Sequence, residues 1–93
     1  MHYVYILKSH KNNDFYTGCT QDLKERLKLH NSGKVFATQA YRPRSLIHYE
    51  AFINKKDAYI REKWLKTGWG RNQVRKMLAN YLNQMNLSKL SNK

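Results

Sequence analysis

Residues 3–19, YVYILKSHKNNDFYTGC, contain two apolar segments separated by a polar one. The segments 3–7 and 15–19 are rich in aromatic and β-branched residues, which favour strands, whereas the Asn and Asp residues between them favour a turn. We therefore predict an antiparallel hairpin, in which Tyr5 and Tyr16 lie on the same face of the sheet.

The sequence after the hairpin predicts one more strand and three helices. Thr20 is the predicted N-cap of the first helix, and Gly33 ends it. Asn54 opens the second helix, and Gly68 and Gly70 are predicted to break the chain before the third. The predicted segments beyond the first helix are a loop at 34–44, an alternating strand at 46–53, a helix at 54–66 and an amphipathic helix at 71–85.

This order, β-β-α-β-α-α, predicts an α+β fold: a small three-stranded, largely antiparallel β-sheet flanked by helices. The 93 residues are enough for one domain, which we place at 1–85, followed by a flexible C-terminal tail at 86–93. The longest apolar stretch, 3–7, is too short for a transmembrane helix or a signal sequence, and the single Cys19 excludes an internal disulfide. We expect a cytoplasmic location and no membrane partner.

The composition is strongly basic, with 18 Lys and Arg against 6 Asp and Glu and a formal charge of +12. Such an excess on a small body favours phosphate polyanions or anionic membrane surfaces as partners. The sequence has no basic helix with a bulky apolar face of its own for a membrane surface, so we expect nucleic acid. A stretch with few acidic residues predicts a track for the nucleic-acid backbone. The residues of this predicted track are Lys55, Lys56, Lys63, Lys66, Arg71 and Arg75.

Glu62 is a carboxylate on an otherwise apolar helix face. It shares that face with Ala58 and Leu65, which are spaced as in one stripe of a helix. Burial of an unpaired carboxylate costs several kcal/mol, roughly, so a cation must lie beside it. The spacing leaves two interpretations open, a Mg²⁺ ion and an ion pair with a neighbouring Arg or Lys.

Arg26 and His30 are four residues apart, so they project from one side of the first helix. A guanidinium binds phosphate well, and an imidazole exchanges protons near neutral pH. Alternatively, Arg26 belongs with Lys24 and Lys28 to a solvated basic face. Tyr5 and Tyr16 are either packing residues or phenols that orient a water molecule.

Two tripeptides in the hairpin begin an ordered set of motifs. They are Tyr3-Val4-Tyr5 and Tyr16-Thr17-Gly18. The residues that follow in order are Asp22, Leu23, Arg26, Leu27, His30, Arg42, Pro43, Leu46, Tyr49, Glu50, Ala58, Glu62, Lys63, Trp64, Leu65 and Lys66. Over residues 3–76 this set resembles the GIY-YIG nuclease superfamily.

The resemblance implies an endonuclease that hydrolyses phosphodiester bonds in nucleic acid, specifically DNA, with one Mg²⁺ or Mn²⁺ ion and no small-molecule cofactor. By position it assigns Tyr5 and Tyr16 to the active face, Arg26 to the scissile phosphate, His30 to activation of water, and Glu62 to the metal. Two alternatives stay open: a nucleic-acid-binding module of the same fold without catalysis, and a protein-interaction module. The oligomeric state is not predicted.

Overall fold

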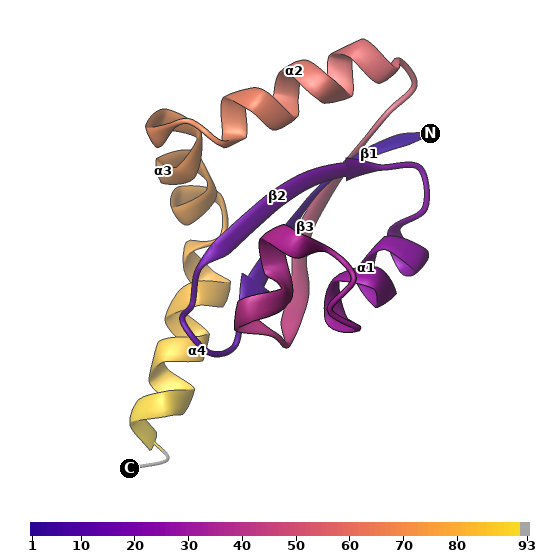
Figure 1. The fold of residues 1–93 in the computed structure, drawn as a ribbon. Helices are drawn as coiled ribbons and strands as arrows, with labels where there is room; N and C mark the ends of the chain where they lie inside the picture. Colours follow the sequence, from indigo (N-terminus) through magenta and orange to yellow (C-terminus); the bar gives the residue numbers. More distant parts are fainter. Residues whose placement is uncertain (92–93) are drawn as a thin grey trace. The chain divides into compact units, whose positions relative to one another are not determined.

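The computed structural model describes residues 1–91 and confirms the predicted hairpin (Figure 1). Its two strands are β1 (His2–Ser9) and β2 (Phe15–Thr20), and a third strand, β3 (Arg44–Phe52), pairs with the other edge of β1. All pairings are antiparallel, and the strand order is β2-β1-β3. The predicted α+β fold class is therefore confirmed.

The register of the hairpin brings the two tyrosines together. Tyr5 lies opposite Gly18, and Leu7 lies opposite Tyr16. Because side chains alternate between faces, Tyr5 and Tyr16 lie on the same face, as predicted. Their ring centroids are 6.4 Å apart.

The predicted alternation of the third strand is interrupted. The register between β1 and β3 shifts between Ile6 and Leu7, which lie opposite His48 and Leu46. Ile47 therefore has no partner residue in β1, as expected at a β-bulge.

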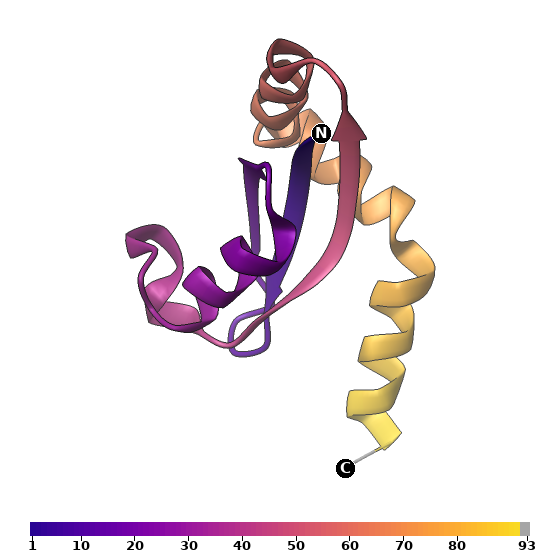
Figure 2. The same cartoon turned by 90° about the vertical axis from the view of Figure 1, so that its right-hand side faces the viewer.

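The central strand supplies most of the core. Val4, Tyr5, Ile6 and Leu7 are consecutive, and all four are buried. Consecutive buried residues require cover on both faces of the sheet, because their side chains point alternately to each. On one of these faces lie the first helix, α1 (Leu23–Asn31), and a short 3₁₀ helix, as Figure 2 shows.

The N-cap of α1 is Asp22, so the prediction of Thr20 was wrong. The Asp22 carboxylate accepts a hydrogen bond from the amide of Glu25 at 3.1 Å. The Thr20 hydroxyl instead accepts from the Asp22 amide at 3.1 Å and forms a turn between β2 and α1. At the other end, Gly33 has a φ of 82°, a conformation that glycine adopts without strain, and the predicted stop is confirmed.

The segment predicted as a loop at 34–44 contains the 3₁₀ helix, η1 (Phe36–Tyr41). The segment ends at Arg44, which the side chain of Asn31 holds in place. This side chain donates to the Arg44 carbonyl at 3.0 Å and accepts from the Arg44 amide at 2.9 Å. A 3₁₀ helix of six residues, about two turns, is too short to produce a recognisable apolar period. The loop prediction was wrong for this reason.

The second helix, α2 (Lys55–Leu65), begins as predicted after Asn54, whose side chain accepts from the Lys56 amide at 2.8 Å. The predicted break at Gly68 and Gly70 was wrong, because a third helix, α3 (Gly68–Met77), contains both glycines. Gly70 is needed for packing, since a Cβ there would lie 2.8 Å from the carbonyl carbon of Leu65.

The helix predicted at 71–85 is in fact divided between α3 and a fourth helix, α4 (Ala79–Ser91), on either side of Leu78. The α4 helix continues into the segment 86–93, which was predicted as a flexible tail, and residues 92–93 lie outside the described part of the chain. No helix in the described part is long and apolar enough to cross a membrane.

The chain divides into two compact units, an N-terminal unit (Met1–Lys63) and a C-terminal unit (Trp64–Lys93). The sheet, α1 and η1 belong to the N-terminal unit, and α3 and α4 to the C-terminal unit. All five residues predicted to be catalytic lie in the N-terminal unit. The single domain at 1–85 stays a prediction.

Candidate active site

A buried hydrogen bond joins Tyr5 on β1 to His30 on α1. The phenol oxygen and the imidazole Nε2 are 2.8 Å apart, and the rings meet edge to face with centroids 5.6 Å apart. Tyr5 is 2% exposed and His30 is 0% exposed. The structure thus brings together two predicted site residues that are 25 positions apart in the chain.

Thr38 on η1 binds the other side of the imidazole, with its hydroxyl 2.7 Å from His30 Nδ1. The same hydroxyl donates to the Val35 carbonyl at 3.4 Å. Its oxygen therefore accepts from Nδ1–H, and Nε2 is left to accept the Tyr5 proton; this assignment follows from the hydrogen-bond network. Thr38 was not predicted, because nothing in the sequence marks the one inward residue of a 3₁₀ turn.

The surroundings keep this imidazole neutral at physiological pH. Burial, followed by the positive charges of Arg26 and Arg44, lowers the pKa of His30 to about 4. Burial also raises the pKa of the Tyr5 phenol, although the hydrogen bond from Arg26 acts against it. A protonated phenol therefore faces an unprotonated imidazole nitrogen, which is the arrangement needed to pass a proton from Tyr5 to His30.

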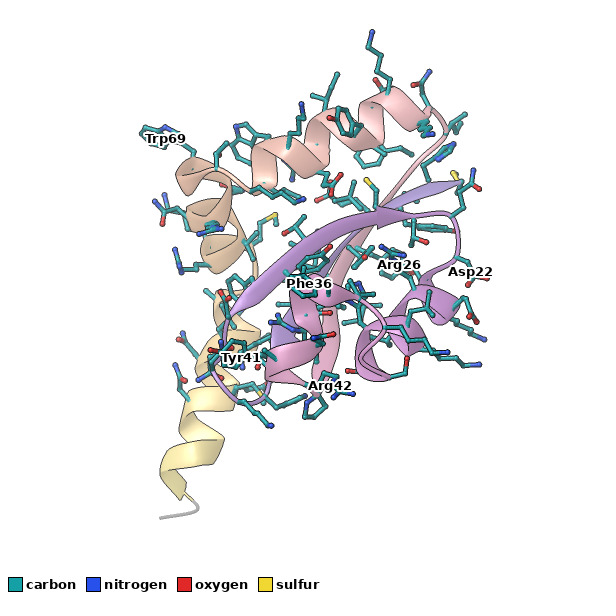
Figure 3. All side chains as sticks on the ribbon, viewed as in Figure 1. Asp22, Arg26, Phe36, Tyr41, Arg42 and Trp69 are labelled. Carbon is teal, nitrogen blue, oxygen red and sulfur yellow. The ribbon has the colours of Figure 1, made fainter. Side chains whose placement is uncertain are left out.

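Arg26 lies at the edge of this pair. Its Nε donates to the Tyr5 oxygen at 3.4 Å, and this contact raises the pKa of Arg26. Figure 3 shows its side chain between α1 and the sheet. Arg26 is half-buried, whereas Lys24 and Lys28 on the same helix are exposed. The solvated basic face therefore consists of the two lysines, and the guanidinium belongs to the site.

Tyr16 on β2 completes the aromatic cluster. Its ring centroid is 4.9 Å from that of His30, and the planes meet at 61°. Gly18, two residues further along the same face, makes room for the cluster, because a Cβ there would lie 2.6 Å from the Cζ atom of Tyr5. The glycine of the second tripeptide thus permits the buried position of the Tyr5 phenol.

Glu62 on α2 acts on the same phenol through its charge, which contributes to the raised pKa of Tyr5. Glu62 is half-buried. Its neighbour Arg61 forms a two-point ion pair with Glu50, with distances of 2.9 and 3.0 Å, and His48 lies 3.0 Å from the same carboxylate. The ion pair at this edge of α2 thus joins Arg61 to Glu50, and both interpretations of Glu62, an ion pair and a metal ligand, stay predictions.

The donor set near Glu62 fits only one class of metal. Among the described residues, no group of three or more His, Cys, Asp or Glu side chains could hold an ion. Structural zinc and calcium sites need several protein ligands, whereas Mg²⁺ keeps most of its waters and accepts one or two carboxylates together with substrate phosphate. A single hard carboxylate such as Glu62 fits Mg²⁺ or Mn²⁺ bound in this way.

The six cations of the predicted track are all exposed. Lys55, Lys56 and Lys63 belong to the N-terminal unit, with Lys63 placed 4.7 Å above the Tyr59 ring. The other three belong to the C-terminal unit and are Lys66, Arg71 and Arg75. Their contact with nucleic acid stays a prediction.

Comparisons with known proteins agree with the fold. A family model described as the GIY-YIG catalytic domain matches residues 1–75. UPF0213 protein CPE1444 of Clostridium perfringens is 38% identical over 95 residues, which cover 94% of this chain and 100% of the relative. A UPF0213 protein of Bacillus pumilus is 39% identical over 89 residues, covering 95% of this chain and 85% of the relative. The solution NMR structure of UPF0213 protein BH0048 from Bacillus halodurans has a TM-score of 0.52 and 34% identity, covering 82% of this chain and 83% of that chain.

Proposed function

The chain belongs to the GIY-YIG family, and from this membership and its buried tyrosine–histidine pair we propose that it is a divalent-metal-dependent endonuclease that hydrolyses phosphodiester bonds in DNA. The family is one of nucleases, which supports a nucleic-acid substrate. The observation that carries the proposal is the 2.8 Å hydrogen bond between Tyr5 and a neutral His30. Any buried phenol needs a hydrogen-bond partner, and here that partner is an unprotonated imidazole nitrogen, which can accept the proton as well as the hydrogen bond.

The proposed reaction is attack of water on the scissile phosphorus. As the oxygen–phosphorus bond forms, Tyr5 accepts a proton from the water and passes its own proton to His30 Nε2. The bond from phosphorus to the 3′ oxygen breaks, and the 3′ alkoxide takes a proton from a solvent water molecule, which leaves 5′ phosphate and 3′ hydroxyl ends. Because the pKa of His30 is about 4, the imidazolium then releases its proton and is ready for another cycle.

Arg26 and Tyr16 have supporting roles in this proposal. Arg26 is held at the Tyr5 oxygen, so its guanidinium can offset the charge that develops on the phosphate. Tyr16 packs its ring against His30 and is proposed to hydrogen-bond within the same network. A Mg²⁺ or Mn²⁺ ion held by Glu62 would stabilise the charge on the leaving 3′ oxygen.

The test is nicking of supercoiled plasmid by the purified chain, with and without Mg²⁺ or Mn²⁺. We expect Tyr5→Phe and Glu62→Ala each to lower the rate about 10²-fold or more, as is usual when a transition-state contact is removed. Tyr41→Phe is the matched control, because Tyr41 is an exposed tyrosine at the end of η1 and its hydrogen bond from Ser9 uses the backbone carbonyl, which the substitution retains. Full activity of Tyr5→Phe would refute the proton transfer, and full activity of Glu62→Ala would refute the metal ligand.

A second candidate, nucleic-acid binding without catalysis, is favoured by the six Lys and Arg residues of the C-terminal unit, which contains no Asp or Glu. Binding that persists without metal, together with intact plasmid under all conditions, would support it. Binding to a protein through apolar surfaces would instead change little between about 50 and 200 mM salt, whereas phosphate binding weakens steeply over that range.

A further inference from the structure

Trp69 is a large aromatic side chain that the fold leaves in solvent. It is 81% exposed, compared with 40% for Trp64, the other tryptophan of the chain. Figure 3 shows it projecting away from the first turn of α3. Tryptophan has a large apolar surface that proteins normally bury in a core or an interface, so its exposure points to a binding surface.

A shallow groove of about 420 Å³ adjoins this indole. Its lining residues are Gly68, Trp69, Arg71, Asn72 and Arg75, and we call it the Trp69 groove. A Cβ at Gly68 would meet nothing within 4 Å, so the space beside the indole is open. Arg75 donates to the Asn72 side chain at 3.1 Å, which orients its guanidinium within the groove.

The charge around the groove determines what it can bind. The C-terminal unit contains six Lys and Arg residues and no Asp or Glu, so its formal charge is +6. A cation is therefore excluded as ligand, and a polyanion is favoured. Guanidinium groups bind phosphate in two-point geometry, and an indole stacks on the flat face of a nucleobase.

An exposed indole beside guanidinium groups favours single-stranded over double-stranded nucleic acid as the ligand. In a duplex the faces of the bases are already stacked on one another, and only the phosphates are accessible to a surface residue. An unpaired base can leave its neighbours and stack on an exposed aromatic ring, as in proteins that bind single strands.

We propose that the Trp69 groove binds single-stranded nucleic acid, with an unpaired base stacked on Trp69 and the adjacent phosphates bound by Arg71 and Arg75. This extends the proposed function, because it names an unpaired segment as part of the substrate. It does not depend on Tyr5, His30 or a metal, so it can be tested without cleavage.

The test is a fluorescence titration of the full chain in EDTA. The probes are oligothymidylate and oligouridylate of about 12 nucleotides, a length within the usual site size, and a blunt hairpin duplex of the same charge. Trp64→Phe provides a background in which Trp69 is the only tryptophan. We expect both single strands to quench the fluorescence and to bind more tightly than the duplex, and the ratio of their affinities gives the preference for DNA or RNA.

Anisotropy of a labelled oligothymidylate then compares variants. We expect Trp69→Ala to weaken binding about 10-fold or more, Trp69→Phe to restore part of the affinity through its ring, and Trp64→Phe to leave the affinity unchanged. Arg71→Ala should weaken binding and reduce its salt dependence by about one phosphate contact.

An unchanged affinity of Trp69→Ala or tighter binding of the duplex would overturn the proposal. Equal binding of polyglutamate would also overturn it and would assign the groove to an acidic protein. If the chain nicks plasmid but single strands do not quench its fluorescence, the proposed binding to the groove is refuted and the proposed endonuclease activity is retained. Quenching and tight binding without nicking would support the groove and refute the endonuclease.

Discussion

Acidification from about pH 7.5 to 5.0 should destabilise this protein through one residue, His30. Its pKa is about 4 in the folded chain, against 6.5 for an unperturbed histidine. As the pH falls, the unfolded chain takes up a proton near pH 6.5, whereas the folded chain does so only near pH 4. Stability is therefore constant above about pH 6.5 and is lost progressively between about 6.5 and 4.

The size of this loss of stability follows from the difference between the pKa of His30 in the folded and in the unfolded chain. Each pH unit in this window costs about 1.4 kcal/mol, so the free energy of unfolding should fall by about 2 kcal/mol at pH 5.0. The full loss near pH 4 would be about 3 kcal/mol, but Glu50, whose pKa is lowered mainly by Arg61, also begins to contribute there. Measurements down to about pH 5.0 therefore isolate His30.

The assay is urea unfolding followed by circular dichroism at several pH values. His30→Gln should be less stable than the unaltered chain at about pH 7.5, because it loses the hydrogen bonds of the imidazole with Tyr5 and Thr38. Its stability should hardly change between about pH 7.5 and 5.0, because it has no imidazole at this position to protonate. His10→Gln is the matched control, because His10 is exposed, and it should keep the slope of the unaltered chain. The same slope in His30→Gln would refute the assignment of the buried neutral imidazole.

Three further predictions concern close contacts. Gly18→Ala should displace the Tyr5 phenol, with a stability loss of about 1–3 kcal/mol by urea unfolding and a slower nicking rate; unchanged stability would contradict the close approach. Thr38→Val leaves the imidazole Nδ1–H without its acceptor and should cost about 1–3 kcal/mol, whereas Thr38→Ser should retain most of the stability; equal losses would contradict the hydrogen bond. Gly70→Ala should lower the melting temperature because its Cβ meets backbone, and Gly68→Ala, at an open position of the same helix, should leave it equal or higher; the reverse order would contradict the packing of α3.

The sheet and four of the site residues could be predicted because each depends on a short local pattern. Two apolar segments around a polar turn define the hairpin, and its alternation places Tyr5 and Tyr16 on one face. The i to i+4 spacing puts Arg26 and His30 on one side of α1. Arg26 and His30 reach the tyrosines if this side of α1 faces the sheet. The hydrogen bonds that join Tyr5 to both residues show that it does.

The errors arose where a distant contact decides the local structure. Glycine has a low helix propensity, so Gly70 predicts a break. The structure instead places Gly70 inside α3, at a position where the backbone of Leu65 lies too close for any side chain. Thr20 and Asp22 are both good N-caps, and the length of β2, which ends at Thr20, decides between them. Thr38 is identified only by the imidazole that it contacts.

The acidic residues show how the two units differ in their chemistry. All six Asp and Glu residues lie in the N-terminal unit, beside twelve Lys and Arg, whereas the six Lys and Arg residues of the C-terminal unit have no acidic neighbours in that unit. In the N-terminal unit, Asp22 caps α1, Glu50 binds Arg61, and Glu62 acts on the Tyr5 phenol. Asp22 and Glu50 thus each accept hydrogen bonds from a specific donor. The C-terminal unit combines uniform formal positive charge with an exposed indole, which suits affinity for a polyanion. The proposed nuclease needs the neutral imidazole of the N-terminal unit and a binder does not, whereas the +12 charge suits both.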